Sequence, residues 1–188
     1  ASIDDAANVA GEIQAISGKT EGGIMLCGAT IHSSQKSSAI IVISYTGTGC
    51  LTGFSRTGSI TITLEDYASG KRWRDAGAVL QLQYNNVRVT NTITGGYFTL
   101  NGTHTLTNIT GGLAWRILDG LDIGTVLHRH TSTGFTLTWA DGTERTWSVN
   151  RLRTFTNIAG VRSITVSSDH TEGGVANADA WGTNRRGD

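Results

Sequence analysis

Apolar and polar residues alternate along several segments of the chain. The alternation is clearest over residues 59–64, 79–84 and 135–139, where Thr, Ser or Gln separates the apolar positions. Successive side chains of a β-strand point to opposite faces, so a period of two predicts strands with one buried and one polar face. Half-buried strands of this kind are typical of antiparallel sheets. We therefore expect an all-β fold.

Further strands are expected between turn residues such as Ser69-Gly70 and Gly111-Gly112. They are residues 24–33, 38–46, 86–92, 96–109, 113–118, 143–156 and 161–167. Consecutive strands joined by short turns form an antiparallel meander or a β-sandwich, here of long, Thr-rich strands. We assign residues 21–188 to a single all-β domain. Residues 1–20 form a separate N-terminal segment, in which Ser2 would cap a short helix that ends at Gly18.

The turn at Asp141-Gly142 admits two strand registers. A two-residue turn would pair Ala140 with Thr143, whereas a three-residue turn with a Gly bulge would pair Trp139 with Thr143. The second register places Phe135 opposite Trp147 and keeps the apolar residues of both strands on one face. We prefer it because a slip of one residue would expose that apolar set.

Charge and motifs narrow the classes of function. Only 16% of the residues are charged and the net charge is zero, so no electrostatic field favours a nucleic acid or an anionic membrane. Apolar runs such as residues 40–43 are far too short to span a membrane. No nucleotide-binding, metalloprotease or nucleophile-elbow motif occurs. We expect a protein that is not an enzyme and needs no cofactor.

Aromatic and basic residues suggest one candidate binding face. Arg145, Arg151 and Arg153 share one face of a predicted strand with Trp147, and Trp73 lies in a basic turn segment. Such residues could bind a glycan or an anionic ligand through stacking and bidentate contacts. The alternative is that the arginines pair with acidic residues across strands while the tryptophans fill a core.

Two further sets of residues leave alternatives open. His128 and His130 lie on one face of a strand and could form half of a metal site, but no third ligand is apparent, so we predict no metal. Cys27 and Cys50 are either reduced core thiols or a disulfide that closes a loop of about 22 residues and contributes about 3 kcal/mol. We favour the disulfide, which implies an oxidising compartment.

A short repeat suggests that the sheet has an open edge. Residues 53–58 and 182–187 share the pattern G-x-[S/N]-R-x-G. The first copy leads into the predicted strand 59–64, whereas the second leads only into Asp188, where a strand would be expected. The chain also contains no proline, a residue that often blocks the edges of sheets. Both observations favour a subunit that shares strands with a partner.

Several ordered turn and strand motifs resemble a family of uncharacterised secreted lipoproteins of Bacteroidota. They are Cys27-Gly28, Gly49-Cys50, residues 53–62, Tyr67, residues 86–91, residues 101–108, residues 139–147 and residues 181–187. The resemblance covers about residues 24–188 and implies export, a Cys27–Cys50 bridge and attachment to the cell surface. Family members continue beyond the last motif into another strand, and they carry a lipidated cysteine that this sequence lacks. The resemblance implies no catalytic or binding residues.

Two functions follow as expectations. The first is an extracellular or cell-surface structural subunit that associates with itself or another surface protein by strand addition, as in a filament or a surface layer. The alternative is a surface binding module for glycans or other ligands, which would use the Trp and Arg residues described above.

Overall fold

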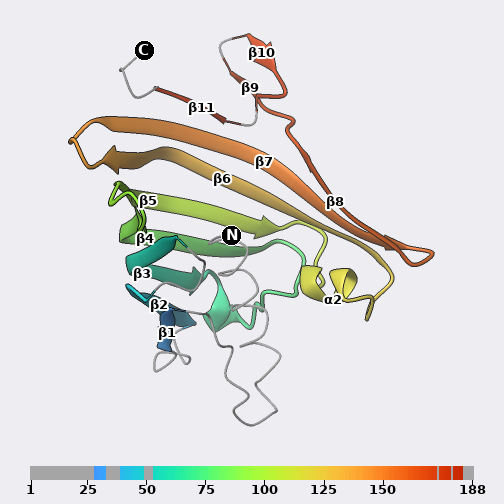
Figure 1. Cartoon of the computed structure of the whole chain (residues 1–188). Coiled ribbons are helices and arrows are strands. Elements are labelled where there is room, and N and C mark those ends of the chain that lie inside the picture. The colour runs from blue at the N-terminus through green and yellow to red at the C-terminus, as the bar shows by residue number, and fades with distance from the viewer. Residues whose placement is uncertain (1–27, 33–38, 49–52, 173, 179, 184–188) are drawn as a thin grey trace.

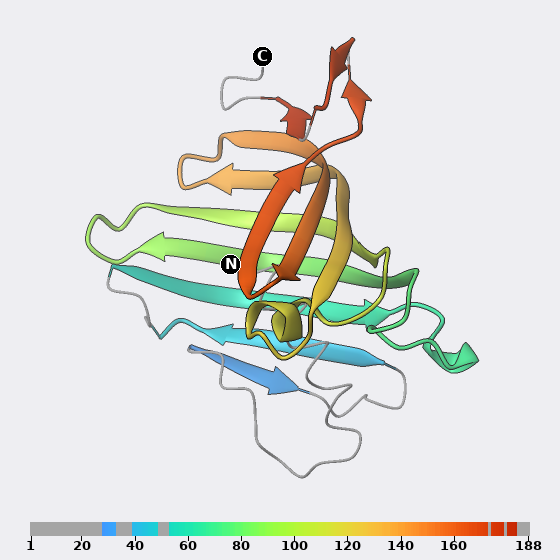
Figure 2. The ribbon, with the colours of Figure 1, turned by 90° about the vertical axis from the view of Figure 1, so that its right-hand side faces the viewer.

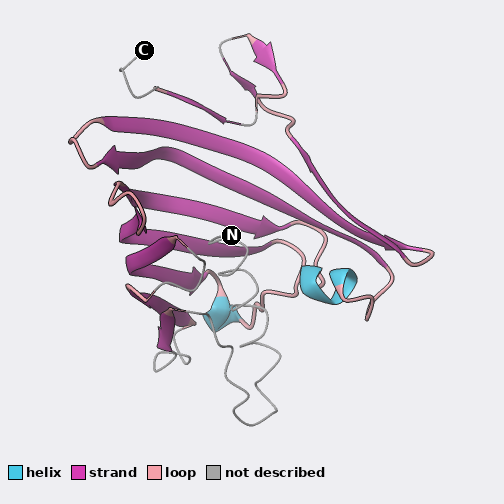
Figure 3. Cartoon of the chain, viewed as in Figure 1, coloured by secondary structure: helices cyan, strands magenta, loops and turns pink. Residues whose placement is uncertain are grey.

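The computed structural model describes residues 28–32, 39–48, 53–172, 174–178 and 180–183. These residues form an open, antiparallel meander sheet of nine strands with one short α-helix (Figures 1 and 3). The expected all-β class and the meander are therefore confirmed, and the described residues do not form a β-sandwich. The expected helix within residues 1–20, Cys27, Cys50 and the chain after Thr183 lie outside the described residues.

Neighbouring strands in the main sheet are almost all neighbours in the sequence. The strand order is β1-β2-β3-β4-β5-β6-β7-β11, with β8 also paired to β7, and β9 and β10 form a separate pair. The strands are β1 (Ala29–His32), β2 (Ile40–Thr46), β3 (Phe54–Leu64), β4 (Ala78–Asn91), β5 (Tyr97–Asn108), β6 (Gly124–Trp139), β7 (Glu144–Ile158), β8 (Val161–Ser167), β9 (Thr171–Glu172), β10 (Val175–Ala176) and β11 (Ala180–Gly182). A 3₁₀ turn, η2 (Tyr67–Ser69), precedes β4, and the helix α2 (Ala114–Leu118) precedes β6.

The prediction of a strand over residues 113–118 was wrong, because this segment contains α2. Its apolar residues Ala114, Ile117 and Leu118 are spaced as on one face of a helix. They pack against Val126 of β6 and Phe155 of β7, so the segment buries its apolar side as a helix. A strand would send Ile117 and Leu118 to opposite faces.

The other differences concern the lengths of strands. The segments expected as two strands, residues 79–84 and 86–92, form one strand, β4, which ends at Asn91 and passes through a bulge without a turn. β6 begins at Gly124 and joins the expected strand at residues 135–139 to the strand that carries His128 and His130. The expected β6–β7 register is confirmed: Trp139 N donates to Thr143 O (2.9 Å), and Phe135 pairs with Trp147.

The sheet curls strongly around one face, which we call the concave face and on which α2 lies (Figures 1 and 2). A row of β-bulges crosses the four central strands. They lie between Thr57 and Ser59 in β3, at residues 85–86 in β4, at 102–103 in β5 and at 133–134 in β6. Bulges bend a strand and increase its twist, so their alignment accounts for a bend across the sheet.

The main apolar core lies on the concave face. Its members alternate along β2 to β6 and include Ile43, Ile60, Leu82, Leu106 and Phe135. The opposite, convex face carries Thr, Ser, Gln and Asn residues, such as those that pair across the sheet at Thr63, Gln81 and Thr105. The alternation seen in the sequence thus corresponds to a single apolar face and a single polar face.

Candidate functional site

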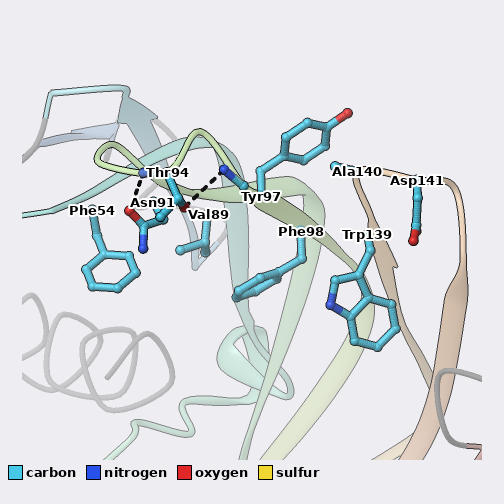
Figure 4. Close-up of a pocket in the computed structure, with 10 residues that line it drawn as sticks. Phe54, Val89, Asn91, Thr94, Tyr97, Phe98, Trp139, Ala140 and Asp141 are labelled. Atoms are coloured by element: carbon cyan, nitrogen blue, oxygen red, sulfur yellow. Dashed lines mark hydrogen bonds between the residues drawn. The ribbon is translucent and has the colours of Figure 1, made fainter.

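An open pocket lies on the concave face at the end of the sheet where the β4–β5 and β6–β7 turns meet (Figure 4). Its volume is about 390 Å³. Val89, Phe98 and Trp139 form its floor, because they pair in one row across β4, β5 and β6. Phe54, at the start of β3, forms a wall and keeps 47% of its surface exposed. We call this site the aromatic pocket.

Polar groups surround the aromatic pocket and fix the turns at its rim. Asn91 Oδ1 accepts hydrogen bonds from the backbone N–H groups of Ile93 (2.9 Å) and Thr94 (3.1 Å). Its amide nitrogen points to the same side as the ring of Phe54 (Figure 4). On the other rim, Asp141 Oδ1 accepts hydrogen bonds from the backbone N–H (3.0 Å) and the hydroxyl (2.6 Å) of Thr143. The rim therefore presents an amide donor and a carboxylate acceptor.

The chemistry of the aromatic pocket suits a ligand with an apolar face and a polar periphery. Its volume is within the usual range for small-molecule sites, and such sites combine apolar walls with a few polar groups. The rings of Phe54, Phe98 and Trp139 supply apolar area and can stack on a ligand. The amide and carboxylate at the rim can donate to and accept from hydroxyl groups.

The structure places all five predicted binding residues on or against the concave face but in two separate groups. Arg145 lies over the ring of Trp147 at 5.4 Å, and that ring packs against Phe135 (centroids 5.1 Å apart). Arg151 and Arg153 lie further along β7 and are half-buried, opposite His130 and His128 of β6. The first group lies toward the turn end of the sheet and the second beside the buried histidines.

Trp73 does not provide a binding surface. It is only 1% exposed, and its ring contacts His128 with centroids 5.0 Å apart. The prediction that Trp73 presents its ring to a ligand is therefore not compatible with its position in the core. The face that carries the predicted binding residues is concave (Figures 1 and 2).

The histidines on the concave face form a buried polar cluster. His130 Nε2 lies 2.8 Å from His104 Nδ1, and both side chains are buried. Burial, together with the positive charge of His130 and Arg151, lowers the pKa of His104 to about 3. Burial, with the charges of Arg153 and Arg151, lowers the pKa of His130 to about 4. Both imidazoles are therefore neutral at physiological pH.

His128 and His130, the two histidines that could have formed half of a metal site, face different partners. His130 contacts His104, whereas the ring of His128 packs between Trp73 and Phe155, at 5.0 and 5.1 Å between centroids. Within the described ranges no three His, Cys, Asp or Glu side chains are arranged to hold a metal ion.

The sequence did not identify the aromatic pocket. The sequence indicated Trp139 only for the turn register, and no motif links it to Phe54, Val89 and Phe98, which lie in three other strands. Their common feature is position: each occupies a concave-face site at the same end of the sheet, where β3 and β5 begin and β4 and β6 end. That pattern becomes visible only when the register of four strands is known.

Comparison with known proteins found no match for the chain. No family model matches it, and neither do any of the curated proteins or solved structures with which it was compared. The resemblance to Bacteroidota lipoproteins stays a prediction. In the part of the chain that the structure describes, no helix is long and apolar enough to cross a membrane.

Proposed function

We propose that the chain is a non-catalytic binding module of the cell exterior that holds a sugar ring in the aromatic pocket. The observation that carries this proposal is the convergence of Phe54, Phe98 and Trp139 on one open pocket. One face of a pyranose ring presents C–H groups, and its edge presents hydroxyl groups. An aromatic floor with an amide and a carboxylate at its rim matches both features.

The position of the pocket supports binding from solution. It lies at an end of the sheet rather than within the core, and Phe54 exposes nearly half of its surface there. Burying an exposed aromatic side chain against a ligand stabilises the complex through the hydrophobic effect. The low charge of the chain is consistent with a neutral ligand.

A panel of defined hexasaccharides built from glucose, xylose, mannose or N-acetylglucosamine tests the proposal. We expect at least one to bind, as measured by calorimetry and by quenching of tryptophan fluorescence. Phe54→Ala should weaken that binding about fivefold or more, because truncation of an aromatic residue at a binding hot spot costs over about 1 kcal/mol. Trp139→Phe should retain more affinity than Trp139→Ala.

Ile123→Ala is the matched control. Ile123 is also apolar and exposed, but it precedes β6 at the opposite end of the sheet. Its removal should leave the affinity unchanged. Equal affinities of Phe54→Ala and wild type, or an absence of binding across the panel, would contradict the sugar-binding proposal. Binding of the apolar dye anilinonaphthalene sulfonate alone would assign the pocket to a different class of ligand.

A second candidate function is the structural subunit that assembles by strand addition at the cell surface. The specific observation in its favour is β8, an exposed strand at an edge of the sheet. Unpaired edge strands are templates for pairing with another chain. This candidate uses different residues from the aromatic pocket, and both activities could be present in one molecule.

A further inference from the structure

β8 is an edge strand with a long exposed surface. Among the described strands it pairs only with β7, and all seven of its residues are exposed. Ile164 and Val166, on the concave side, are 53% and 52% exposed. Natural edge strands are usually protected by charge, proline or a covering segment. β8 carries one charge, Arg162, and no proline.

The turn before β8 determines which of its backbone groups point outward. Ala159 and Gly160 both have positive φ angles (51° and 81°), as in a two-residue type I′ turn. Such a turn is closed by a hydrogen-bonded pair, here Ile158 and Val161. The backbone groups of odd-numbered residues from Val161 onward therefore face β7. Those of Arg162, Ile164 and Val166 face away from the sheet.

We propose that β8 pairs antiparallel with β8 of a second copy of this chain, about a twofold axis at Ile164. This inference goes beyond the sugar-binding proposal and specifies the partner for the second candidate function. In this register Ile164 faces Ile164 of the other copy, and Arg162 faces Val166. These are the residues with outward backbone groups, so every outward N–H and C=O finds a partner.

The side chains of β8 suit this self-pairing. On the concave side, the register places Ile164 against Ile164 and separates the two Arg162 charges. Arg162 Nη1 also donates to the carbonyl oxygen of Leu118 (2.9 Å), which holds the guanidinium toward its own α2. On the convex side, Ser163 would face Thr165 of the other copy and extend the hydroxyl pair of Thr156 and Ser163 (2.7 Å). A strand of this length gives a small interface, so the dimer should be weak and concentration-dependent.

Sedimentation velocity of the full chain between about 10 μM and about 1 mM tests the dimer. We expect a shift from monomer to dimer within this range. Ile164→Lys should weaken the dimer at least tenfold, because it places two like charges opposite each other at the twofold axis. Val161→Lys is the matched control: it adds the same charge to β8 far from the axis, and the dissociation constant should change by less than about threefold.

Amide hydrogen exchange of the unmodified chain gives an independent test of the register. The amides of Arg162, Ile164 and Val166 should become protected as the concentration rises. Those of Ser163 and Thr165 should be protected at every concentration, because they bond to β7. A chain that stays monomeric would overturn the proposal. So would a dimer in which the outward amides exchange as fast as in the monomer. Neither result bears on the sugar-binding proposal, which has its own readout.

Discussion

At the scale of single residues, the protonation of the buried pair His104 and His130 affects the stability of the fold. The ring nitrogen of His130 that faces away from His104, Nδ1, is buried without a hydrogen-bond partner among the described residues. A buried N–H without an acceptor is less tolerable than a lone pair without a donor. We infer that His130 carries its proton on Nε2 and donates it to His104 Nδ1. This arrangement requires both imidazoles to be neutral.

We expect the pair to make the fold acid-sensitive. In the unfolded chain both imidazoles bind protons near pH 6.5, but in the folded chain only near pH 4 and 3. The unfolded state therefore binds more protons between these values, and the free energy of unfolding falls as the pH drops below about 6.5. The loss between pH 7 and pH 5 should be roughly 2–4 kcal/mol, measured by urea unfolding at both pH values.

Two single-residue variants separate this effect from other titrations. His104→Gln removes one titrating group and should flatten the dependence of stability on pH between 7 and 5. His32→Gln, at an exposed position of β1, should leave that dependence as in the wild type. A wild-type stability that is equal at pH 7 and pH 5 would refute the assignment of neutral, buried imidazoles.

Asn108 shows how one buried amide holds a loop to the sheet. It is fully buried, and its Nδ2 donates to Trp73 O (2.8 Å) and Gly112 O (2.9 Å) while Oδ1 accepts from Gly111 N (3.0 Å). Asn108→Ala would leave these three groups unsatisfied and should lower the free energy of unfolding by about 3 kcal/mol. Asn85→Ala removes only hydrogen bonds of 3.4 Å and should cost about 0.5 kcal/mol in the same denaturation assay. Equal costs would contradict this account.

At the scale of elements, the row of bulges depends on residues without a side chain. Gly58 lies at the β3 bulge with φ of +91°, and a Cβ there would collide with the backbone carbonyl of Asn86. Gly58→Ala should therefore destabilise the fold by about 3 kcal/mol or more. Gly70→Ala tests the contribution of φ alone, because Gly70 has φ of +94° and open space around it.

Gly70→Ala should cost only about 1 kcal/mol in the same thermal or urea denaturation measurement. A Gly58→Ala protein as stable as Gly70→Ala would show that the close approach of β3 and β4 at the bulge is not important. The bulge itself can be checked in the variant by the exchange rate of the Asn86 amide, which donates to Asn101 Oδ1 (2.8 Å).

The elements also show where prediction from the sequence succeeds. Alternation over residues 59–64 and 135–139 predicted real strands, because each sends one set of side chains into the core. It failed at α2, where five residues are too few for a helical period to be recognised. The same pattern predicted two strands where β4 is one, because the bulge at Asn85-Asn86 interrupts the period of two in the same way as a turn does.

At the scale of the whole molecule, curvature creates the candidate site. The aligned bulges bend the sheet, and Val89, Phe98 and Trp139 then line one open pocket at its turn end. The sequence indicated tryptophan and arginine as binding residues but could not indicate where they lie. Trp73 lies in the core, whereas Phe54, which the sequence did not indicate as a binding residue, forms a wall of the pocket. Long-range register determined both outcomes, and no local pattern encodes it.

The exposed edges of the sheet are also a property of the whole molecule. The sequence suggested an exposed edge after residue 187, which lies outside the described residues. β8 presents an exposed edge within the described part of the chain, and β11 pairs with β7 along a separate stretch of that strand. The edge and the aromatic pocket are formed by different residues, so the tests of assembly and of ligand binding are independent.

Amide chemical-shift mapping tests the central claim, that the aromatic pocket binds sugar, most directly. The ¹⁵N-labelled chain would be titrated with the tightest-binding hexasaccharide of the panel. We predict that the largest shifts fall on Phe54, Val89, Phe98 and Trp139, together with the indole N–H of Trp139. Shifts confined to the convex Thr-rich face, or no shifts with any hexasaccharide, would contradict the claim.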